Sequence, residues 1–215
     1  YRHDYGEFIT GSTTTRQTSN SAATTLFDST FYVLTSARNV YKCLDNNNNA
    51  TSTDEPTGVS TSVTTTADGY RWKYMYTLSA AQQASFLSVD FMAVSPNSSP
   101  GSDQSNVISA AVDGSIDVIK IKSAGSGGTN GTHTNIPIRG DGTGGVCSVT
   151  VSGGAVTAVS VTNAGSGYTF ATVSNAQIVA AGATSLAGAE LDVIIPPKGG
   201  HGANAQEELG AFFVM

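Results

Sequence analysis

The sequence contains one pattern twice, at an offset of 40 residues. Residues 118–128 read Val-Ile-Lys-Ile-Lys-Ser-Ala-Gly-Ser-Gly-Gly, and residues 158–168 read Ala-Val-Ser-Val-Thr-Asn-Ala-Gly-Ser-Gly-Tyr. In each copy, side chains alternate with the period of a β-strand, and a glycine-rich turn segment follows. Such a unit builds a β-rich scaffold and contributes no obvious nucleophile, base or metal ligand. It therefore favours a structural or assembly protein.

Charge and chain length limit the classes of protein that fit. The 215 residues suit one large or two small domains, and only 12% of them are charged, with a net charge of −6. The basic pairs Arg71/Lys73 and Lys120/Lys122 are typical of solvated strand faces, whereas nucleic-acid binding needs clustered Lys and Arg. No apolar run has the length of a membrane span. We expect neither nucleic acid nor a membrane as a partner.

Hydrophobic periodicity and turn residues place the elements. A capped helix is predicted at 80–87 after Ser79, a helical turn at 205–210, and a linker at 96–106. Gly153-Gly154 predicts a two-residue hairpin. The predicted strands are 8–10, 31–34, 39–44, 70–78, 90–94, 116–122, 146–151, 155–162, 176–180 and 191–195.

These elements predict a mainly β fold. We expect two β-sandwich-like domains with one or two short helices, the second domain inserted into the first. Residues 1–106 plus 190–215 would form the discontinuous domain, and residues 107–189 the inserted glycine-rich one. Because the chain begins at Tyr1 and stops on the apolar run 211–215, we also expect residues to be missing from one or both ends.

The strand at 70–78 is the most aromatic in the chain. Alternation places Tyr70, Trp72, Tyr74 and Tyr76 on one face and Arg71, Lys73 and Met75 on the other. Each ring buries roughly 150–250 Å². This face is either packed on a core or partner, which we favour, or forms a platform on which sugars stack.

Candidate catalytic and metal-binding residues are few. His3, His133 and His201 lie in polar or glycine-rich loops without a second His or Cys at ligand spacing, so we expect no metal, cofactor or catalytic residue. For His201, between two glycines, a loop-anchoring hydrogen bond is favoured over catalysis. Cys43 and Cys147 are expected to be buried free thiols rather than a disulfide.

Other short motifs carry weaker signals. Asp54/Glu55 and Glu207/Glu208 are sequence neighbours, whereas a glycosidase needs two carboxylates that face each other across a cleft. Arg139-Gly140-Asp141 spells a cell-adhesion tripeptide, which in a glycine-rich turn we interpret as chance. The glycine turns do not open helices, so they do not predict phosphate binding.

Two passages resemble a known family. The first is Val40-Tyr41-Lys42-Cys43-Leu44-Asp45, followed after an Asn-rich gap by Glu55-Pro56 and then by the strand Asp68-Gly69-Tyr70-Arg71-Trp72-Lys73-Tyr74-Met75-Tyr76. The second is Pro197-Lys198-Gly199-Gly200-His201-Gly202, leading to Glu208-Leu209-Gly210-Ala211. Together they resemble the baseplate wedge subunit of T-even-like contractile-tail phages, the gene-eight product type, in its cyanophage-like form. The motifs cover about a third of the chain.

The resemblance implies a mostly β, two-domain structural protein of the virion. It would form a homodimer in the tail baseplate wedge, contact other wedge proteins and hold the wedge together before tail contraction. It would be assembled in the host cytoplasm and would catalyse no reaction. Low charge and aromatic strand faces suit such extensive contacts.

Two other functions stay open at this point. A carbohydrate-binding tail-fibre or adhesin module would use the rings of Tyr70, Trp72, Tyr74 and Tyr76, and it predicts that these rings are exposed. A polysaccharide-degrading enzyme of the β-solenoid type would need three or more regular repeats, whereas the sequence shows two copies.

Overall fold

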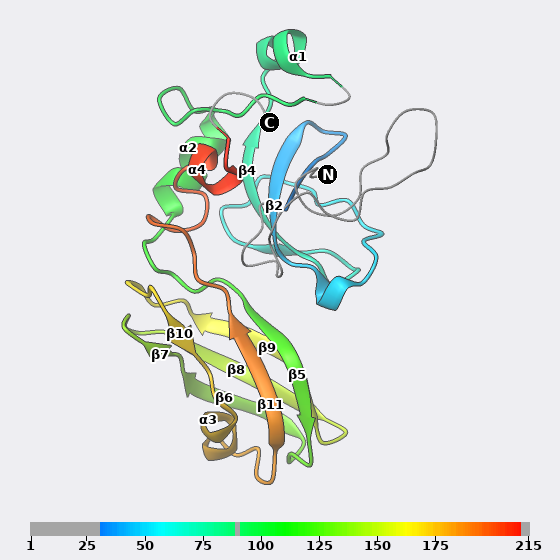
Figure 1. The fold of residues 1–215 in the computed structure, drawn as a ribbon, viewed down its shortest axis with the longest axis vertical. Coiled ribbons are helices and arrows are strands. Elements are labelled where there is room, and N and C mark those ends of the chain that lie inside the picture. The colour runs from blue at the N-terminus through cyan, green and yellow to red at the C-terminus, as the bar shows by residue number, and fades with distance from the viewer. Residues whose placement is uncertain (1–30, 89–90, 212–215) are drawn as a thin grey trace. The chain divides into compact units, whose positions relative to one another are not determined.

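The computed structural model describes residues 31–88 and 91–211. The chain divides into two compact units, unit 1 from Tyr1–Ala111 and His201–Met215, and unit 2 from Val112–Gly200 (Figure 1). The described residues are mainly β, which confirms the predicted fold class, but they contain four short α-helices where one or two were expected. The insertion of one domain into the other stays a prediction. The predicted strand at 8–10 and His3 lie outside the described residues.

Unit 1 is built around a four-stranded antiparallel sheet. Its order is β1 (Tyr32–Leu34), β2 (Asn39–Asp45), β4 (Arg71–Thr77) and β3 (Thr64–Thr65). Strands β1, β2 and β4 match the strands predicted from apolar and aromatic runs. The Asn-rich segment after β2 forms the short turn η1 (Asn47–Asn49), and Asn48 adopts the left-handed conformation that asparagine tolerates.

Over its described residues, unit 1 has the helices α1 (Ala80–Phe86), α2 (Ser102–Ala110) and α4 (Ala205–Leu209). Helix α1 begins as predicted, because Ser79 and Gln82 form a reciprocal capping box. Helix α4 is the predicted helical turn.

Helix α2 shows that the predicted linker at 96–106 was wrong in its second half. The helix has buried Gln104 and Val107 at i, i+3 spacing. The Gln104 amide accepts a hydrogen bond from the Ser95 hydroxyl and donates one to the Ser95 carbonyl. The predicted strand at 90–94 is also wrong over its described part, because residues 91–94 belong to no named strand.

A bulge corrects the predicted aromatic face of β4. Tyr41 of β2 is opposite Tyr74, whereas Val40 is opposite Tyr76, so Met75 is an extra residue on β4. A bulge of this kind shifts the alternation along the strand, so the side chains beyond it point to the opposite face of the sheet. Tyr70, Trp72 and Tyr74 accordingly share one core cluster. Tyr76 packs with Met75 in another.

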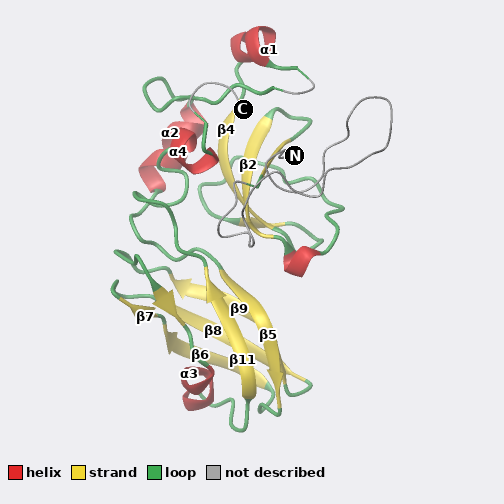
Figure 2. Cartoon of the chain, viewed as in Figure 1, coloured by secondary structure: helices red, strands yellow, loops and turns green. Residues whose placement is uncertain are grey.

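Unit 2 contains three small antiparallel sheets and one helix (Figure 2). Its elements are β5 (Ile119–Ser126), β6 (Gly131–Pro137), β7 (Arg139–Gly140), β8 (Val146–Ser152), β9 (Ala155–Asn163), β10 (Ala171–Thr172), α3 (Asn175–Ala180) and β11 (Ala187–Val193). Strands β6, β8 and β9 form one sheet, β5 pairs with β11, and β7 pairs with β10. The core contains Ile119, Ile136, Cys147, Val149, Val159 and Ile178.

The sequence repeat corresponds to a reciprocal exchange of hydrogen bonds. The Gly128 N–H donates to the Gly154 carbonyl at 2.9 Å, and the Tyr168 N–H donates to the Gly114 carbonyl at 3.2 Å. Gly114 and Gly154 each stand four residues before one copy and are 40 residues apart, as are Gly128 and Tyr168, so each copy donates to the segment just before the other at equivalent positions. The equivalent pair Gly125 and Gly165 also share one left-handed conformation, with φ of +64° in both. The two copies thus make matching contacts with each other, although their strands belong to different sheets.

Several elements of unit 2 differ from the prediction: the short strands β7 and β10 were not predicted, and β11 spans Ala187–Val193 in place of 191–195. The segment predicted as a strand at 176–180 is helix α3, because Ser174 and Gln177 form a capping box that starts a helix. The first glycine turn begins late, since β5 continues through Ser126, which pairs with Ala187. Strand β6 was missed, because it is mostly polar and buries only His133 and Ile136. The hairpin at Gly153-Gly154 is confirmed, and both glycines have positive φ.

Candidate functional site

The aromatic residues of unit 1 are buried. Tyr70, Trp72, Tyr74 and Tyr76 are 6%, 1%, 2% and 0% exposed. Tyr70 stacks on Trp72 with ring centroids 5.5 Å apart, and Tyr74 meets Tyr41 edge-on at 5.7 Å. These rings form core, and they offer no surface on which a sugar ring could stack.

The polar atoms of the same rings are paired within the chain. The Tyr70 hydroxyl donates to the Ala50 carbonyl at 2.6 Å, and the Tyr76 hydroxyl donates to the Ala93 carbonyl at 2.9 Å. Trp72 Nε1 donates to the Thr66 hydroxyl at 3.2 Å. Burial raises the pKa of Tyr76 far above its ordinary value. The buried phenol therefore stays neutral and acts as a structural hydrogen-bond donor.

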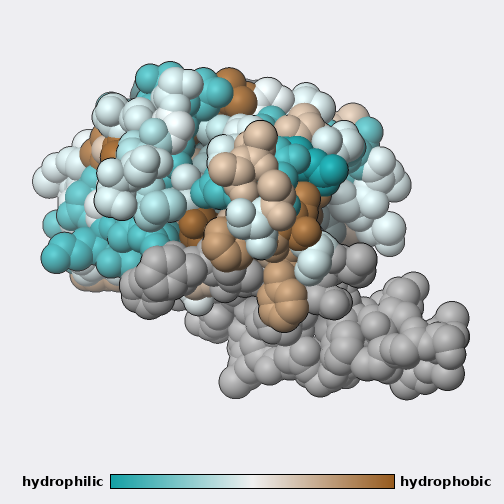
Figure 3. Space-filling view, turned by 90° about the horizontal axis from the view of Figure 1, so that it is seen from above, coloured by the Kyte–Doolittle hydropathy of each residue, from teal (hydrophilic) through white to brown (hydrophobic). Residues whose placement is uncertain are grey.

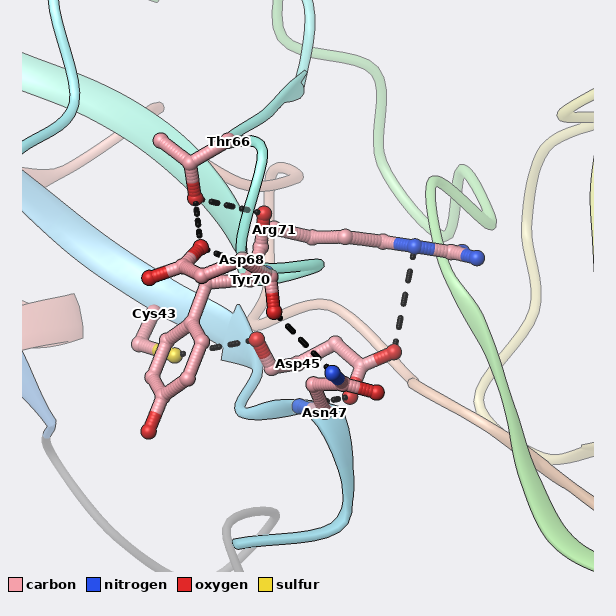
Figure 4. A network of polar contacts seen from close by, with 7 residues as sticks. All are labelled: Cys43, Asp45, Asn47, Thr66, Asp68, Tyr70 and Arg71. Carbon is pink, nitrogen blue, oxygen red and sulfur yellow. Dashed lines mark hydrogen bonds and ion pairs between the residues drawn. The ribbon is translucent and has the colours of Figure 1, made fainter. Parts of the chain in front are cut away.

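A network of polar contacts joins the start of β4 to the end of β2 (Figure 4). Asp68 Oδ1 accepts hydrogen bonds from the Thr66 hydroxyl at 2.5 Å and from the Tyr70 N–H at 3.2 Å. The Asn47 amide donates to the Asp68 carbonyl, and the Asn47 N–H donates to Asp45 Oδ1, both at 3.0 Å. The two strands of the first resembling passage are thereby held in register at their ends.

The second oxygen of Asp68 organises the loop that precedes β3. Asp68 Oδ2 accepts from the Ser52 hydroxyl at 2.8 Å and from the Thr53 and Asp54 N–H groups at 2.9 and 3.2 Å. The Thr66 hydroxyl and these further donors hold the pKa of Asp68 well below its ordinary value. Asp68 thus acts as a loop-organising acceptor.

His201 is paired with a second buried side chain, Glu208 of α4. His201 and Glu208 are 4% and 3% exposed, and His201 Nδ1 lies 2.5 Å from Glu208 Oε1. Because an ionised carboxylate only accepts, the proton of this hydrogen bond is on Nδ1. The other oxygen, Oε2, accepts from the Gly202 N–H at 2.7 Å. Glu208 therefore closes the loop that precedes α4.

Two lysines of the sheet approach this loop. Lys42 Nζ lies 3.5 Å from Glu208 Oε1 and donates to the Glu208 carbonyl at 3.2 Å. Burial raises the pKa of Glu208, but the His201 hydrogen bond, the charge of Lys42 and the Gly202 N–H outweigh it and hold the pKa below its ordinary value. Lys73 is buried, and its Nζ donates to the Thr61 carbonyl at 2.7 Å.

Gly202 permits the close approach of the loop. A Cβ at this position would lie 2.3 Å from Val107 Cγ1 of α2 and 3.3 Å from Lys73 Cε, and φ is +88°. A larger residue would displace α2 or the buried lysine. His201, Gly202 and Glu208 thus connect α4, α2 and the sheet of unit 1.

Sequence reasoning missed Glu208, Lys42 and Lys73. Glu208 was treated only as the sequence neighbour of Glu207, yet Ala205, Glu208 and Leu209 are the buried residues of α4. Their i, i+3, i+4 spacing is the signal that could have identified Glu208 as buried. The prediction of a solvated face was wrong for Lys73. For Lys122 it is confirmed, because this exposed lysine pairs with exposed Glu190 at 3.2 Å.

The remaining candidates have structural roles. His133 Nε2 lies 2.9 Å from the Thr129 carbonyl. Asp141 of the Arg-Gly-Asp tripeptide accepts from the Thr169 hydroxyl and from the N–H groups of Thr169 and Phe170, which lowers its pKa to about 2. This carboxylate is therefore already occupied by its own chain. Cys43 and Cys147 are buried thiols, as predicted, and Cys43 Sγ donates to the Asp45 carbonyl at 3.3 Å.

The described residues show neither a metal-binding cluster nor a membrane-spanning helix. Residues 31–88 and 91–211 contain no group of three or more His, Cys, Asp or Glu that could hold a metal ion. Within the same ranges, the helices are too short or too polar to cross a membrane.

Comparison with known proteins identifies no relative of this chain. No family model, no curated protein and no solved structure matches it.

Proposed function

We propose that this protein is a structural subunit of a phage tail baseplate wedge and acts by protein–protein assembly. The observation that carries the proposal is that parts of these passages, far apart in sequence, meet in unit 1. The resemblance to baseplate wedge subunits rests on residues 40–45, 55–56, 68–76, 197–202 and 208–211. Of these, 40–45 lie in β2, 68–76 lie in β4 and its preceding turn, and 201–202 and 208–211 lie in and next to the loop and helix α4, whereas 197–200 belong to unit 2.

The contacts between these passages are those of a rigid scaffold. Lys42 joins β2 to α4, and Gly202 packs closely on Val107 and Lys73. The Asp68 and Asn47 contacts join the ends of β2 and β4. These polar groups form hydrogen bonds within the chain, and such networks make a unit rigid. The motifs therefore support a function in which a rigid unit presents its surface to other chains.

Helix α1 is a candidate for that surface. It has no buried residue, and its sequence Ala-Ala-Gln-Gln-Ala-Ser-Phe carries no charge. Phe86 and Phe91, at its end and just beyond it, are 53% and 59% exposed. Apolar residues also gather near the centre of the face in Figure 3, next to hydrophilic ones. Exposed aromatic side chains surrounded by polar ones are common in protein interfaces.

The proposed assembly is a homodimer that also contacts other wedge proteins in the virion tail. Such contacts hold the wedge together until the baseplate rearranges, and alternative packings of rigid units provide the switch. This mechanism requires no cofactor, nucleic acid or membrane.

Light scattering of the purified chain tests the self-association. We expect a dimer, and we expect Phe86→Ser with Phe91→Ser to shift it towards monomer while leaving the unfolding midpoint unchanged, because both side chains are exposed. Phe170→Ser in unit 2, where the ring is 58% exposed, is the matched control. A monomer at all concentrations, together with binding to a glycan array, would contradict the proposal. A density map of a baseplate from a phage that encodes this chain would test the location directly.

A further inference from the structure

The loop between β5 and β6 carries an exposed asparagine that is followed by glycine. Asn130 precedes Gly131, and every other asparagine of the chain precedes a residue with a side chain. Both residues are exposed, and Gly131 is the first residue of β6. A Cβ built on Gly131 would meet nothing within 4 Å beyond its chain neighbours. The Asn130 amide therefore lies in solvent beside a backbone nitrogen with open space around it.

The side-chain oxygen of Asn130 is bonded to the neighbouring hairpin. The Gly154 N–H donates to Asn130 Oδ1 at 2.9 Å, and the Gly154 carbonyl accepts from the Gly128 N–H at 2.9 Å. Gly154 lies in the turn between β8 and β9. A donor at a carbonyl oxygen stabilises the negative charge that develops there when a nucleophile attacks the carbon. The fold thus makes Cγ of Asn130 more electrophilic.

We propose that Asn130 is a site of spontaneous deamidation, with the Gly131 backbone nitrogen as the nucleophile. This nitrogen loses its proton to hydroxide and attacks Cγ of Asn130. A bond from nitrogen to Cγ forms, the side-chain nitrogen leaves as ammonia, and the product is a succinimide ring. Glycine suits this attack because it has no Cβ and its backbone turns freely.

Hydrolysis of the succinimide ring gives two products. Aspartate results when the bond from the ring nitrogen to Cγ breaks, and isoaspartate results when the bond to the main-chain carbonyl carbon breaks. Aspartate keeps an oxygen where the Gly154 N–H donates. Isoaspartate adds one carbon to the backbone just before β6, where Gly131 pairs with Val151. The added carbon disturbs the register of this strand pair.

Peptide mapping of the unaltered protein, aged at mildly alkaline pH, tests the proposal. Mass spectrometry of the digest distinguishes the amide from the acid at each asparagine. Asn163 is the internal control, because it is also exposed and its Oδ1 accepts from the Gly165 N–H at 3.1 Å, but Ala164 follows it. We expect Asn130 to convert at least about tenfold faster than Asn163. No conversion at Asn130, or equal rates at the two residues, would overturn the proposal.

Detection of isoaspartate separates the cyclic route from direct hydrolysis of the amide. Isoaspartyl methyltransferase methylates isoaspartate and leaves ordinary aspartate unchanged, so the aged protein should become a substrate at residue 130. Aspartate as the sole product would exclude the succinimide. Asn130→Gln is the matched control, because it keeps the amide but forms its ring far more slowly, and it should stay unmethylated at this residue after ageing.

Calorimetry measures the effect on unit 2. The isoaspartyl protein should unfold at a lower temperature than the Asn130→Asp variant, which carries the same charge on an unaltered backbone. Equal unfolding temperatures of the two would contradict the expected disturbance of β6.

Discussion

Glu208→Gln is the substitution that most directly tests the arrangement of unit 1. Glutamine has the shape of glutamate, so packing is preserved and only charge and bonding change. In the protein the carboxylate is buried, accepts from His201 Nδ1 and from the Gly202 N–H, and lies 3.5 Å from Lys42 Nζ. The glutamine amide keeps one oxygen as an acceptor. Its NH₂ group is a donor at the place where the second carboxylate oxygen accepted a hydrogen bond.

The expected loss follows from these three contacts. Two charge-assisted hydrogen bonds become neutral, or one of them is lost, at about 1 kcal/mol each. The Lys42 ammonium loses its buried partner, but its side chain keeps 14% exposure, which limits that contribution to about 1 kcal/mol. We expect Glu208→Gln to destabilise unit 1 by about 2–4 kcal/mol.

Urea unfolding followed by tryptophan fluorescence measures this loss. Trp72 is the sole tryptophan and is buried in unit 1, so its emission reports the unit that contains Glu208. Glu207→Gln is the matched control, because it makes the same chemical change at the exposed neighbouring position of α4. It should change stability by no more than about 0.5 kcal/mol. Equal, small effects of the two substitutions would refute the reasoning.

The pH dependence of the stability of wild type and of Glu208→Gln tests whether Glu208 is ionised in the folded protein. The pKa of Glu208 in the folded protein is lower than its ordinary value of 4.5. In the interval below that value the unfolded chain binds more protons, so stability falls as the pH falls. The stability that Glu208 contributes should be fully present above pH 4.5 and lost as the pH drops through the folded pKa. The difference between wild type and Glu208→Gln should therefore narrow in acid, and a constant difference would contradict the assignment.

Three further predictions concern unit 2. Tyr168→Phe removes a hydroxyl that donates to the Ile138 carbonyl and accepts from the Gly145 N–H. It should cost about 1–3 kcal/mol, measured by calorimetry, with Trp72 emission unchanged. Ser174→Ala removes the cap of α3 and should cost about 1 kcal/mol by the same measurement. Burial raises the pKa of the Cys147 thiol to about 11, so a thiol reagent at pH 8 should label it only after unfolding. Rapid labelling of the folded chain would count against its burial.

Local chemistry made several elements predictable from the sequence. Alternating aromatic and β-branched residues identified β2 and β4, Ser79 identified the start of α1, and Gly153-Gly154 identified the hairpin. Each of these signals acts over a few residues, through backbone geometry or a single side-chain cap. The same kind of reasoning missed the capping box before α3, because the run 176–180 is too short for its period to separate a strand from a helix.

The candidate site depended on contacts over long sequence distances. The glycines on both sides of His201 predicted a hydrogen bond that anchors its loop. The sequence did not identify Glu208 as the partner or Lys42 as a neighbour. Lys42 and Glu208 are 166 residues apart in the chain, so no local pattern reports their meeting. The bulge at Met75 likewise arises from pairing with β2 and moves Tyr76 away from the other rings.

The sequence alone determined that the chain is mainly β, that one strand–turn unit occurs twice, and that its aromatic residues concentrate in one strand. Periodicity and turn chemistry suffice for these features, because they are properties of neighbouring residues. The tertiary structure alone decided that hydrogen bonds join equivalent positions around the two copies, and that Glu208 is buried against His201 and Lys42. A buried charge is stable only where distant groups surround it with donors, and that surrounding exists only once the chain has folded.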